Sequence, residues 1–163
     1  MQFVTKRNKV LYIIIGTLFL FSFKYSSTIN WTKISKSSEK VFHQENITFE
    51  QIEDNVGMFS ILAKKESIGF LVYSKARSKN NIFDFYILYS SDKEILKVEV
   101  LNYREDHGFE ICNKRWLEQF IGLGNQSEFD FKNRVDGISG ATISVNSLKD
   151  EVFFLTQKIK SRL

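Results

Sequence analysis

The chain has 163 residues, of which 43% are apolar and 15% aromatic, so it can build one folded domain around a hydrophobic core. Its formal net charge is +4, and four basic residues near the N-terminus, Lys6, Arg7, Lys9 and Lys24, account for all of it. Beyond Lys24 the basic and acidic residues are balanced and interspersed, which excludes the clustered cations of a nucleic-acid-binding surface. With a single cysteine, Cys112, the chain can form no intramolecular disulfide, no four-cysteine zinc site and no thiolate-ligated cluster, and we expect this residue to be a small buried side chain.

The N-terminal segment has the pattern of a membrane-targeting sequence. Basic residues within 1–9 precede an uncharged stretch, VLYIIIGTLFLFSF, from Val10 to Phe23. These fourteen residues would form about 21 Å of helix, which is short of the ~30 Å hydrocarbon core and fits a cleaved signal peptide. However, no small-residue cleavage site follows, and Lys24 can extend towards the interface. We therefore predict an uncleaved signal anchor, with a cleaved signal peptide as the alternative.

The basic residues also predict topology and domain organisation. Positive residues before a single span stay in the cytoplasm, so the rest of the chain faces the extracytoplasmic side of the cytoplasmic membrane. Residues 1–31 are predicted to form the anchor and interface segment, and residues 32–39, TKISKSSE, a polar tether. Residues 40–163 are predicted to form one domain.

Four segments rich in β-branched and aromatic residues, 58–63, 68–74, 82–89 and 95–103, predict strands. Short polar turns, KKES and SSDK, join the first and last pairs, which predicts antiparallel neighbours. Apolar and polar residues alternate incompletely in 95–103, so we expect one face of the sheet to be well buried and the other only in part.

Two segments have the apolar spacing of amphipathic helices. Residues 116–121 predict a helix that ends at Gly122, and the C-terminal segment predicts a longer helix with Ser147 as its N-cap. Residues 41–55 have irregular apolar spacing that allows a further helix. The predicted fold class is α+β, an antiparallel sheet with flanking helices.

One run of small and hydroxyl residues lies between the predicted sheet and the last helix, DGISGATIS from Asp136 to Ser144. Unpaired N–H groups and the positive end of the helix dipole could hold a phosphate there without a basic side chain. Glycines in such a run let another molecule approach the backbone closely. The residues alone fit equally a plain strand-to-helix turn, with Asp-Gly as the turn and Ser144 or Ser147 as the cap.

Other chemical motifs are excluded by inspection. The chain has no Gly-Lys-Ser/Thr, hence no P-loop. Both histidines, His43 and His107, precede the one run that faintly suggests a nucleophile elbow, against the order in serine hydrolases. Carboxylates do not cluster with the histidines, so we predict neither a metal site nor a catalytic residue.

The run from Asp136 to Thr142 resembles the flavinylation motif of the FMN-binding domain family, which includes the FMN-carrying subunits of sodium-pumping quinone reductases and Rnf-type complexes. Segments 102–111 and 116–122 look like the region before the motif in single-anchor extracytoplasmic members, so the resemblance covers roughly residues 95–155. In that family a flavin transferase moves FMN from FAD to the threonine that ends the motif. The resemblance therefore implies FMN joined covalently to Thr142 through a phosphoester.

The resemblance also implies the rest of the cofactor site. Hydroxyl and N–H groups near the motif could bond the phosphodiester oxygens, and Asp136 is either read by the transferase or simply forms the turn. Aromatic residues in the matched segment could support the flavin ring, although aromatics are equally ordinary core residues. The predicted cofactor-binding residues are Asp136, Gly137, Ser139, Gly140, Ala141, Thr142, Ser144, Tyr103 and Trp116, with Phe109 and Phe120 as further candidates for the ring.

The implied function is a membrane-anchored electron carrier that receives electrons from a membrane partner and passes them to an extracytoplasmic acceptor, and not a stand-alone enzyme. Its expected partners are a flavin transferase, redox proteins and the membrane, without nucleic acid. One alternative is a reductase subunit for a small acceptor, with Glu105, His107 or Glu110 as proton donor. Another is an anchored binding module without flavin.

Overall fold

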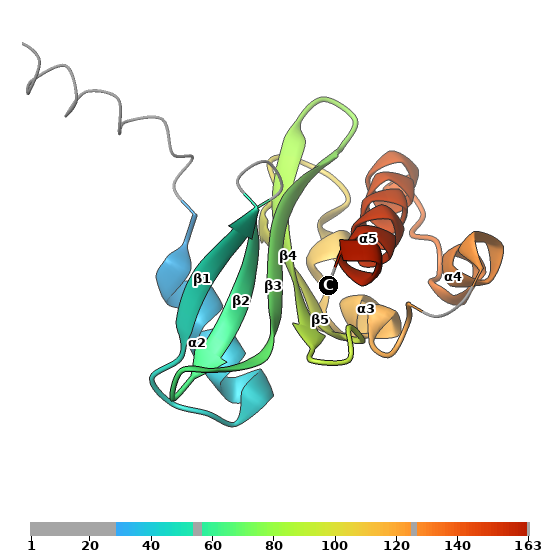
Figure 1. Ribbon diagram of the computed structural model, residues 1–163. Helices are drawn as coiled ribbons and strands as arrows, with labels where there is room; N and C mark the ends of the chain where they lie inside the picture. Colours follow the sequence, from blue (N-terminus) through green and yellow to red (C-terminus); the bar gives the residue numbers. More distant parts are fainter. Residues whose placement is uncertain (1–28, 54–56, 125–126, 163) are drawn as a thin grey trace, which may run out of the picture. The chain divides into compact units, whose positions relative to one another are not determined.

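The computed structural model describes residues 29–53, 57–124 and 127–162. The predicted anchor lies outside these residues, and none of the helices within them is long and apolar enough to cross a membrane. The described residues from Thr32 onward form one compact unit (Figure 1). Its elements are α2 (Trp31–Phe42), β1 (Thr48–Glu53), β2 (Met58–Ala63), β3 (Glu66–Arg77), β4 (Ile82–Ser90), β5 (Ile95–Asn102), η1 (Phe109–Cys112), α3 (Lys114–Leu117), η2 (Glu118–Phe120), α4 (Glu128–Arg134) and α5 (Thr142–Arg162).

The five strands form one sheet in the order β1-β2-β3-β4-β5, and each strand is antiparallel to the next. The predicted α+β class and the four predicted strands are confirmed, with small shifts at their ends. Strand β3 is longer than predicted because its polar end keeps pairing with β4 as far as Arg77 and Ile82.

The first strand was not predicted. A helix over 41–55 is wrong, because α2 ends at Phe42 and Thr48–Glu53 form β1. The apolar residues of TFEQIE, Phe49 and Ile52, are three apart and do not follow strict strand alternation, and the pairing with β2 shifts register between Gln51 and Glu53. Phe49 lies opposite Ile61 of β2. Pairing with β2 therefore decides the conformation of a segment whose local pattern is ambiguous.

The prediction of a tether at residues 32–39 is also wrong, because these residues lie in α2. Ile34, Ser37 and Ser38 form the buried face of this helix. The Ser37 hydroxyl accepts a hydrogen bond from Lys97 Nζ and is hydrogen-bonded to Tyr86 Oη, each at 2.7 Å, and Ser38 Oγ donates to the Ile34 carbonyl at 2.9 Å. Partners from the sheet and from the helix backbone allow these serines to be buried, so a polar sequence packs as a helix.

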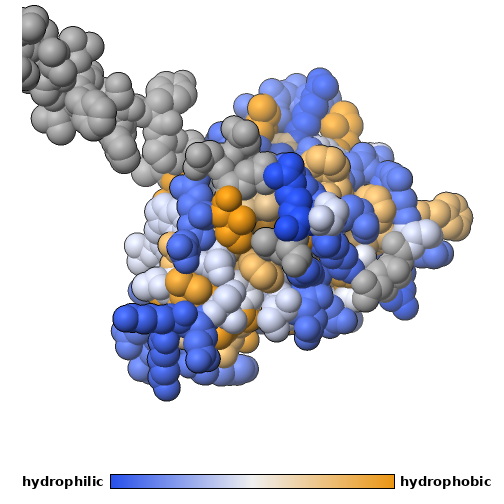
Figure 2. Space-filling view, in the orientation of Figure 1, coloured by the Kyte–Doolittle hydropathy of each residue, from blue (hydrophilic) through white to orange (hydrophobic). Residues whose placement is uncertain are grey.

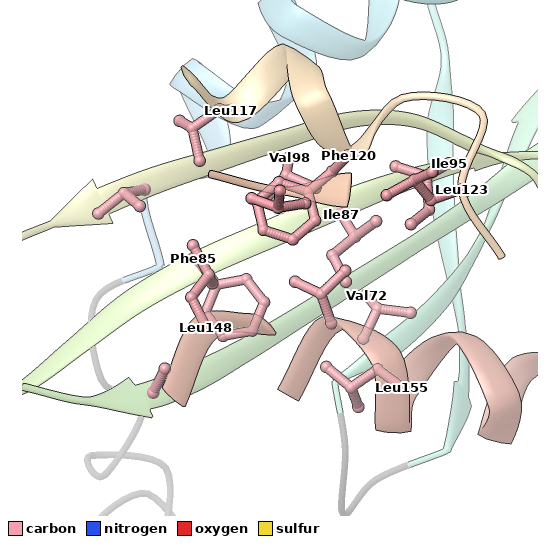
Figure 3. Close-up of a cluster of buried hydrophobic side chains, with 14 of the residues drawn as sticks. Val72, Phe85, Ile87, Ile95, Val98, Leu117, Phe120, Leu123, Leu148 and Leu155 are labelled. Atoms are coloured by element: carbon pink, nitrogen blue, oxygen red, sulfur yellow. The ribbon is translucent and has the colours of Figure 1, made fainter. Parts of the chain in front are cut away.

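Helices cover both faces of the sheet, which explains why every residue from Phe83 to Tyr89 is buried. On one face, Leu148 and Leu155 of α5 point toward Phe85 and Ile87 of β4 (Figure 3). On the other face, α2 packs over the sheet through its contact with Tyr86 (Figure 1). The second face is thus more completely covered than predicted.

The C-terminal half differs from prediction in its helix boundaries. The predicted helix at 116–121 consists of the short segments α3 and η2, followed by Gly122 with φ +74°. Helix α4, whose N-cap Ser127 accepts a hydrogen bond from the Asp130 N–H at 3.2 Å, was not predicted. Helix α5 starts at Thr142, so Ser147 is not its N-cap; its Oγ accepts from the Arg77 N–H at 2.8 Å. Cys112 is exposed, contrary to expectation.

The packing of α2 on the sheet depends on a glycine. A Cβ atom on Gly69 would lie 2.4 Å from the Tyr89 carbonyl oxygen and 2.6 Å from the Phe42 ring. We expect Gly69→Ala to lower the free energy of unfolding by about 1–3 kcal/mol. The control is Gly137→Ala, where a Cβ meets nothing within 4 Å and the change should stay within about 0.5 kcal/mol. Urea denaturation measures both, and a Gly69→Ala protein as stable as the control would contradict this packing.

Glu99 links α2 to the sheet electrostatically. Its carboxylate accepts a hydrogen bond from Tyr86 Oη at 2.6 Å and forms ion pairs with Lys33 at 2.8 Å and Lys97 at 2.7 Å. Burial raises the pKa of Glu99, but the hydrogen bonds from Lys33, Lys97 and Tyr86 outweigh burial and lower this pKa from 4.5 to about 2.

A carboxylate whose pKa is lowered by folding stabilises the protein above its unfolded-state pKa and loses that contribution as pH falls. Between about pH 5 and about pH 3, the free energy of unfolding should therefore fall more for the wild type than for Glu99→Gln, by on the order of 1–2 kcal/mol. Urea denaturation at the two pH values measures this difference. If both proteins lost the same free energy of unfolding, the lysine partners would not lower the pKa of Glu99.

Candidate functional site

The small-residue run forms the connection between α4 and α5, a helix-to-helix turn instead of the strand-to-helix turn considered above. The Ala141 N–H donates to the Ile138 carbonyl at 3.1 Å, and Gly140 has φ +81°, a left-handed conformation that favours glycine. The Val145 N–H donates to the Ala141 carbonyl at 2.9 Å and begins the helical pattern. Thr142 is thus the first residue of α5, and its side chain is exposed.

The N-terminus of α5 supplies the electrostatic feature predicted from the sequence. The first N–H groups of a helix have no intrahelical acceptor, and the helix dipole makes this end positive. In α5 these groups belong to a helix of 21 residues that packs on the core. A negative group attached at Thr142 would therefore lie beside a favourable helix end.

The start of the motif is held by two hydrogen bonds to the backbone of Asp136, which we call the clamp. The Asp136 N–H donates to Gln119 Oε1 at 2.8 Å, and its carbonyl accepts from Trp116 Nε1 at 3.1 Å. Both backbone groups are thereby held by the α3–η2 segment, while the Asp136 residue stays exposed at the surface. The turn that leads to Thr142 starts from a fixed point.

Lys149 of α5 forms hydrogen bonds to the backbone just before the motif. Its side chain is buried, and its ammonium group donates to the carbonyls of Lys132, at 3.0 Å, and Val135. Burial lowers the pKa of Lys149, and the nearby Asp136 carboxylate opposes that shift. This cation joins the end of α4 and the start of the motif to α5.

The other side of the turn packs against the segment after β5. Gly108 has φ +82°, and a Cβ on it would lie 3.0 Å from both Ala141 Cβ and Tyr103 Oη. The Tyr103 hydroxyl is hydrogen-bonded to Ser144 Oγ at 2.9 Å, and its ring lies 5.6 Å from that of Phe109, centroid to centroid. Ser144 therefore braces the helix start from within, because its side chain is buried.

A pocket of about 290 Å³ opens beside Thr142. A larger groove of about 780 Å³ shares Lys79 and Asn80 with it, so the two adjoin at the β3–β4 turn. The groove continues along α5 past Ser147 and Glu151. The smaller pocket is lined by Lys79, Asn80, Tyr103, Glu105, Asp106, His107, Gly140, Ala141, Thr142, Ile143 and Ser144.

Glu105 shapes this pocket by holding the β3–β4 turn. Its carboxylate accepts hydrogen bonds from the Ser78 hydroxyl and from the N–H groups of Asn80, at 2.8 Å, and Asn81, at 2.9 Å. These bonds, that from Ser78 foremost, lower the pKa of Glu105 to about 2. Glu105 is therefore ionised near neutral pH and does not suit the role of proton donor.

The structure brings together some of the predicted site residues and separates others. Tyr103, Gly140, Ala141, Thr142 and Ser144 line the pocket. Asp136, Gly137 and Ser139 lie on the exposed turn outside its lining.

The aromatic candidates divide in the same way. Trp116 and Phe120 belong to the hydrophobic core, with ring centroids 5.6 Å apart, and do not form a surface shelf. Tyr103 lines the pocket, and Phe109, in ring contact with it, is 56% exposed. Tyr103 and Phe109 are thus the aromatic residues that remain available beside the motif.

Several residues that shape the site were not predicted. Gln119 and Gly108 act through the backbone of the motif and leave no chemical pattern in the sequence. Lys149 does leave one, because its helical spacing from Val145 and Val152 places a cation on the buried face of α5. Among the described residues no group of His, Cys, Asp and Glu could hold a metal ion.

The residues present fit a cofactor held through a phosphate. Thr142 offers an exposed hydroxyl at a helix N-terminus, and space is open around Gly137 and Gly140, where an added Cβ would meet nothing within 4 Å.

No curated protein matches the chain. The model of the FMN-binding domain matches residues 80–154, from the β3–β4 turn through the motif and most of α5. Residues 80–154 therefore belong to the FMN-binding domain family, and this membership supports FMN as the cofactor.

Proposed function

We propose that this protein is an extracytoplasmic electron carrier whose FMN is esterified through its phosphate to Thr142 Oγ1. The observation that carries the proposal is the position of Thr142, exposed at the first residue of α5 and at the end of a turn fixed on both sides. FMN supplies the redox chemistry, since it accepts and releases one or two electrons.

The chain's own residues hold and orient the phosphate end of the cofactor. Hydrogen bonds to the phosphodiester oxygens come from the N–H groups of the first turn of α5 and from the Ser139 hydroxyl. Tyr103 and Phe109 offer aromatic surface beside the pocket for the ring. Open space at Gly137 lets a second protein approach the turn closely.

Attachment requires a reachable hydroxyl and little else from this chain. The Thr142 oxygen forms a bond to the phosphorus of the FMN half of FAD, the pyrophosphate bond breaks, and AMP leaves. The hydroxyl proton passes to a base of the flavin transferase, which is the maturation partner in this proposal. A clamped turn favours this reaction because the nucleophile needs no further ordering when the transferase binds.

The N-terminal sequence supports the membrane part of the proposal. Residues 1–23 combine basic residues with an uncharged apolar stretch, the pattern of a signal anchor that leaves the following domain outside the cytoplasm. Covalent attachment suits such a location because a lost flavin could not be replaced from the cytoplasm.

The competing function is a reductase subunit that protonates a small acceptor. His107 lines the pocket beside Thr142 and is the candidate donor that this function would use. Turnover of a small acceptor by the isolated holoprotein, lost in His107→Gln, would favour the reductase. Dependence on a second redox protein would favour the carrier.

Flavin attachment is tested by co-expressing the full chain with a flavin transferase and recording ultraviolet fluorescence of the band on a denaturing gel. We expect a fluorescent band for the wild type and for Ser161→Ala, which removes an exposed hydroxyl near the other end of α5, and none for Thr142→Val. Thr142→Ser keeps a hydroxyl and should retain the flavin. A fluorescent Thr142→Val protein would exclude the assigned residue.

The clamp at Asp136 is tested with Gln119→Leu. Loss of the acceptor for the Asp136 N–H should slow flavin transfer about tenfold or more, because the turn is no longer fixed. Since Gln119 is only partly buried, the free energy of unfolding should change by no more than about 1 kcal/mol.

The control for the clamp is Gln157→Leu, which removes a glutamine that donates to the Gly124 carbonyl at 3.4 Å and does not contact the motif. Rates come from the time course of fluorescence under excess transferase. Equal rates in the two variants would show that the clamp does not position Thr142.

A further inference from the structure

A separate pocket lies over β5, the edge strand of the sheet, between α2 on one side and α3 and η2 on the other. Its volume is about 260 Å³, and it shares no lining residue with the Thr142 pocket or the adjoining groove. Its wall is mainly apolar and is made by Val41, Leu96, Val98, Leu117 and Ile121. Ile121 is 48% exposed, so apolar surface remains in contact with water here.

Lysine side chains from three elements line the same pocket. Lys40 comes from α2, Lys97 from β5 and Lys114 from α3, against one carboxylate, that of Glu118. Lys97 is held by Ser37 and Glu99, and Lys114 lies 3.6 Å from Glu118 with an 87% exposed side chain. Lys40 makes no hydrogen bond or ion pair with the described part of the chain, so positive charge is in excess.

We propose that this pocket binds an anionic amphiphile, with a single acyl chain against the apolar wall and a carboxylate or phosphate head on the lysines. The wall excludes a fully polar ligand because its apolar groups offer no hydrogen bonds, and the excess positive charge disfavours a cationic head. The methylene groups of the lysines can cover the acyl chain of the ligand, while their ammonium groups stay in water beside its anionic head.

The same argument sets the dependence on chain length. Each methylene buried against the wall contributes about 0.8 kcal/mol, so each one added should tighten binding roughly fourfold until the pocket is full. A small pocket of about 260 Å³ sets an early limit to this gain. The inference goes beyond electron transfer and needs no flavin.

The test uses the full chain without flavin in nanodiscs of phosphatidylcholine, a neutral lipid, with a diazirine-labelled decanoate as photoprobe. Mass spectrometry of the digested protein locates the cross-links. We expect them in the pocket segments 37–41, 96–98 and 114–121, with unlabelled alkanoates competing more strongly as their chain lengthens from six to about ten carbons.

The variant Lys40→Glu/Lys114→Glu should lower the cross-link yield in these segments about fivefold or more. The matched control Lys64→Glu/Lys65→Glu changes the same charge at the exposed β2–β3 turn and should leave it unchanged. Vesicles of phosphatidylglycerol, an anionic lipid, should lower the cross-link yield if a membrane lipid can supply the ligand. If only free alkanoate lowers the yield, the ligand is a soluble fatty acid.

Three outcomes would overturn the proposal: cross-links confined to other parts of the chain, equal yields in the two double variants, or equal labelling by an uncharged decanol probe. Because the protein carries no flavin here, none of these outcomes bears on Thr142. Conversely, a chain that is never flavinylated can still bind the amphiphile.

Discussion

The site depends above all on the packing of α5 across the sheet. Leu148, Val152 and Leu155 of α5 are at most 1% exposed and belong to one core with Phe85 and Ile87 of β4 (Figure 3). Burial of this face fixes both the position and the direction of the helix. Because Thr142 is the first residue of α5, the same packing fixes where its hydroxyl meets solvent.

Helix packing alone would leave the preceding turn free to move, and a second set of contacts prevents this. Gln119 and Trp116 hold the backbone of Asp136, and Gly108 permits close contact with Ala141. Buried Lys149 ties the end of α4 to α5. The turn is therefore ordered at both ends, whereas the surface of its middle, around Gly137, is left open. Such an arrangement leaves Thr142 exposed to solvent at the end of an ordered turn.

The face of the domain in Figure 2 mixes hydrophilic and hydrophobic residues. Exposed apolar side chains include Phe109 and Ile143 beside the Thr142 pocket and Ile121 beside the lysine-lined pocket. Apolar residues thus reach water next to both pockets, where a ligand or partner could cover them. The two pockets have no lining residue in common.

Features that depend on the local residue pattern were predicted well. Strands with β-branched and aromatic residues, and the motif before a helix, lie where the pattern indicates. Features created by tertiary contacts were missed. Ser37 and Ser38 are buried in α2 because Tyr86, Lys97 and the helix backbone supply hydrogen-bond partners, which a polar stretch does not reveal.

The same limit applies to the site. Thr142 was assigned to the candidate site from its motif, but the roles of Gln119 and Gly108 arise from residues that meet only in the folded chain. Trp116 was assigned to the flavin ring from its nearness in sequence, yet it packs in the core and binds the Asp136 carbonyl instead.

The central claim, a flavin joined to Thr142, is tested most directly by the mass of the full chain purified after co-expression with a flavin transferase, followed by peptide mapping. The account predicts an added mass of one FMN less one water, on the peptide that contains Thr142. An unmodified chain, or the same mass on a peptide without Thr142, would contradict it.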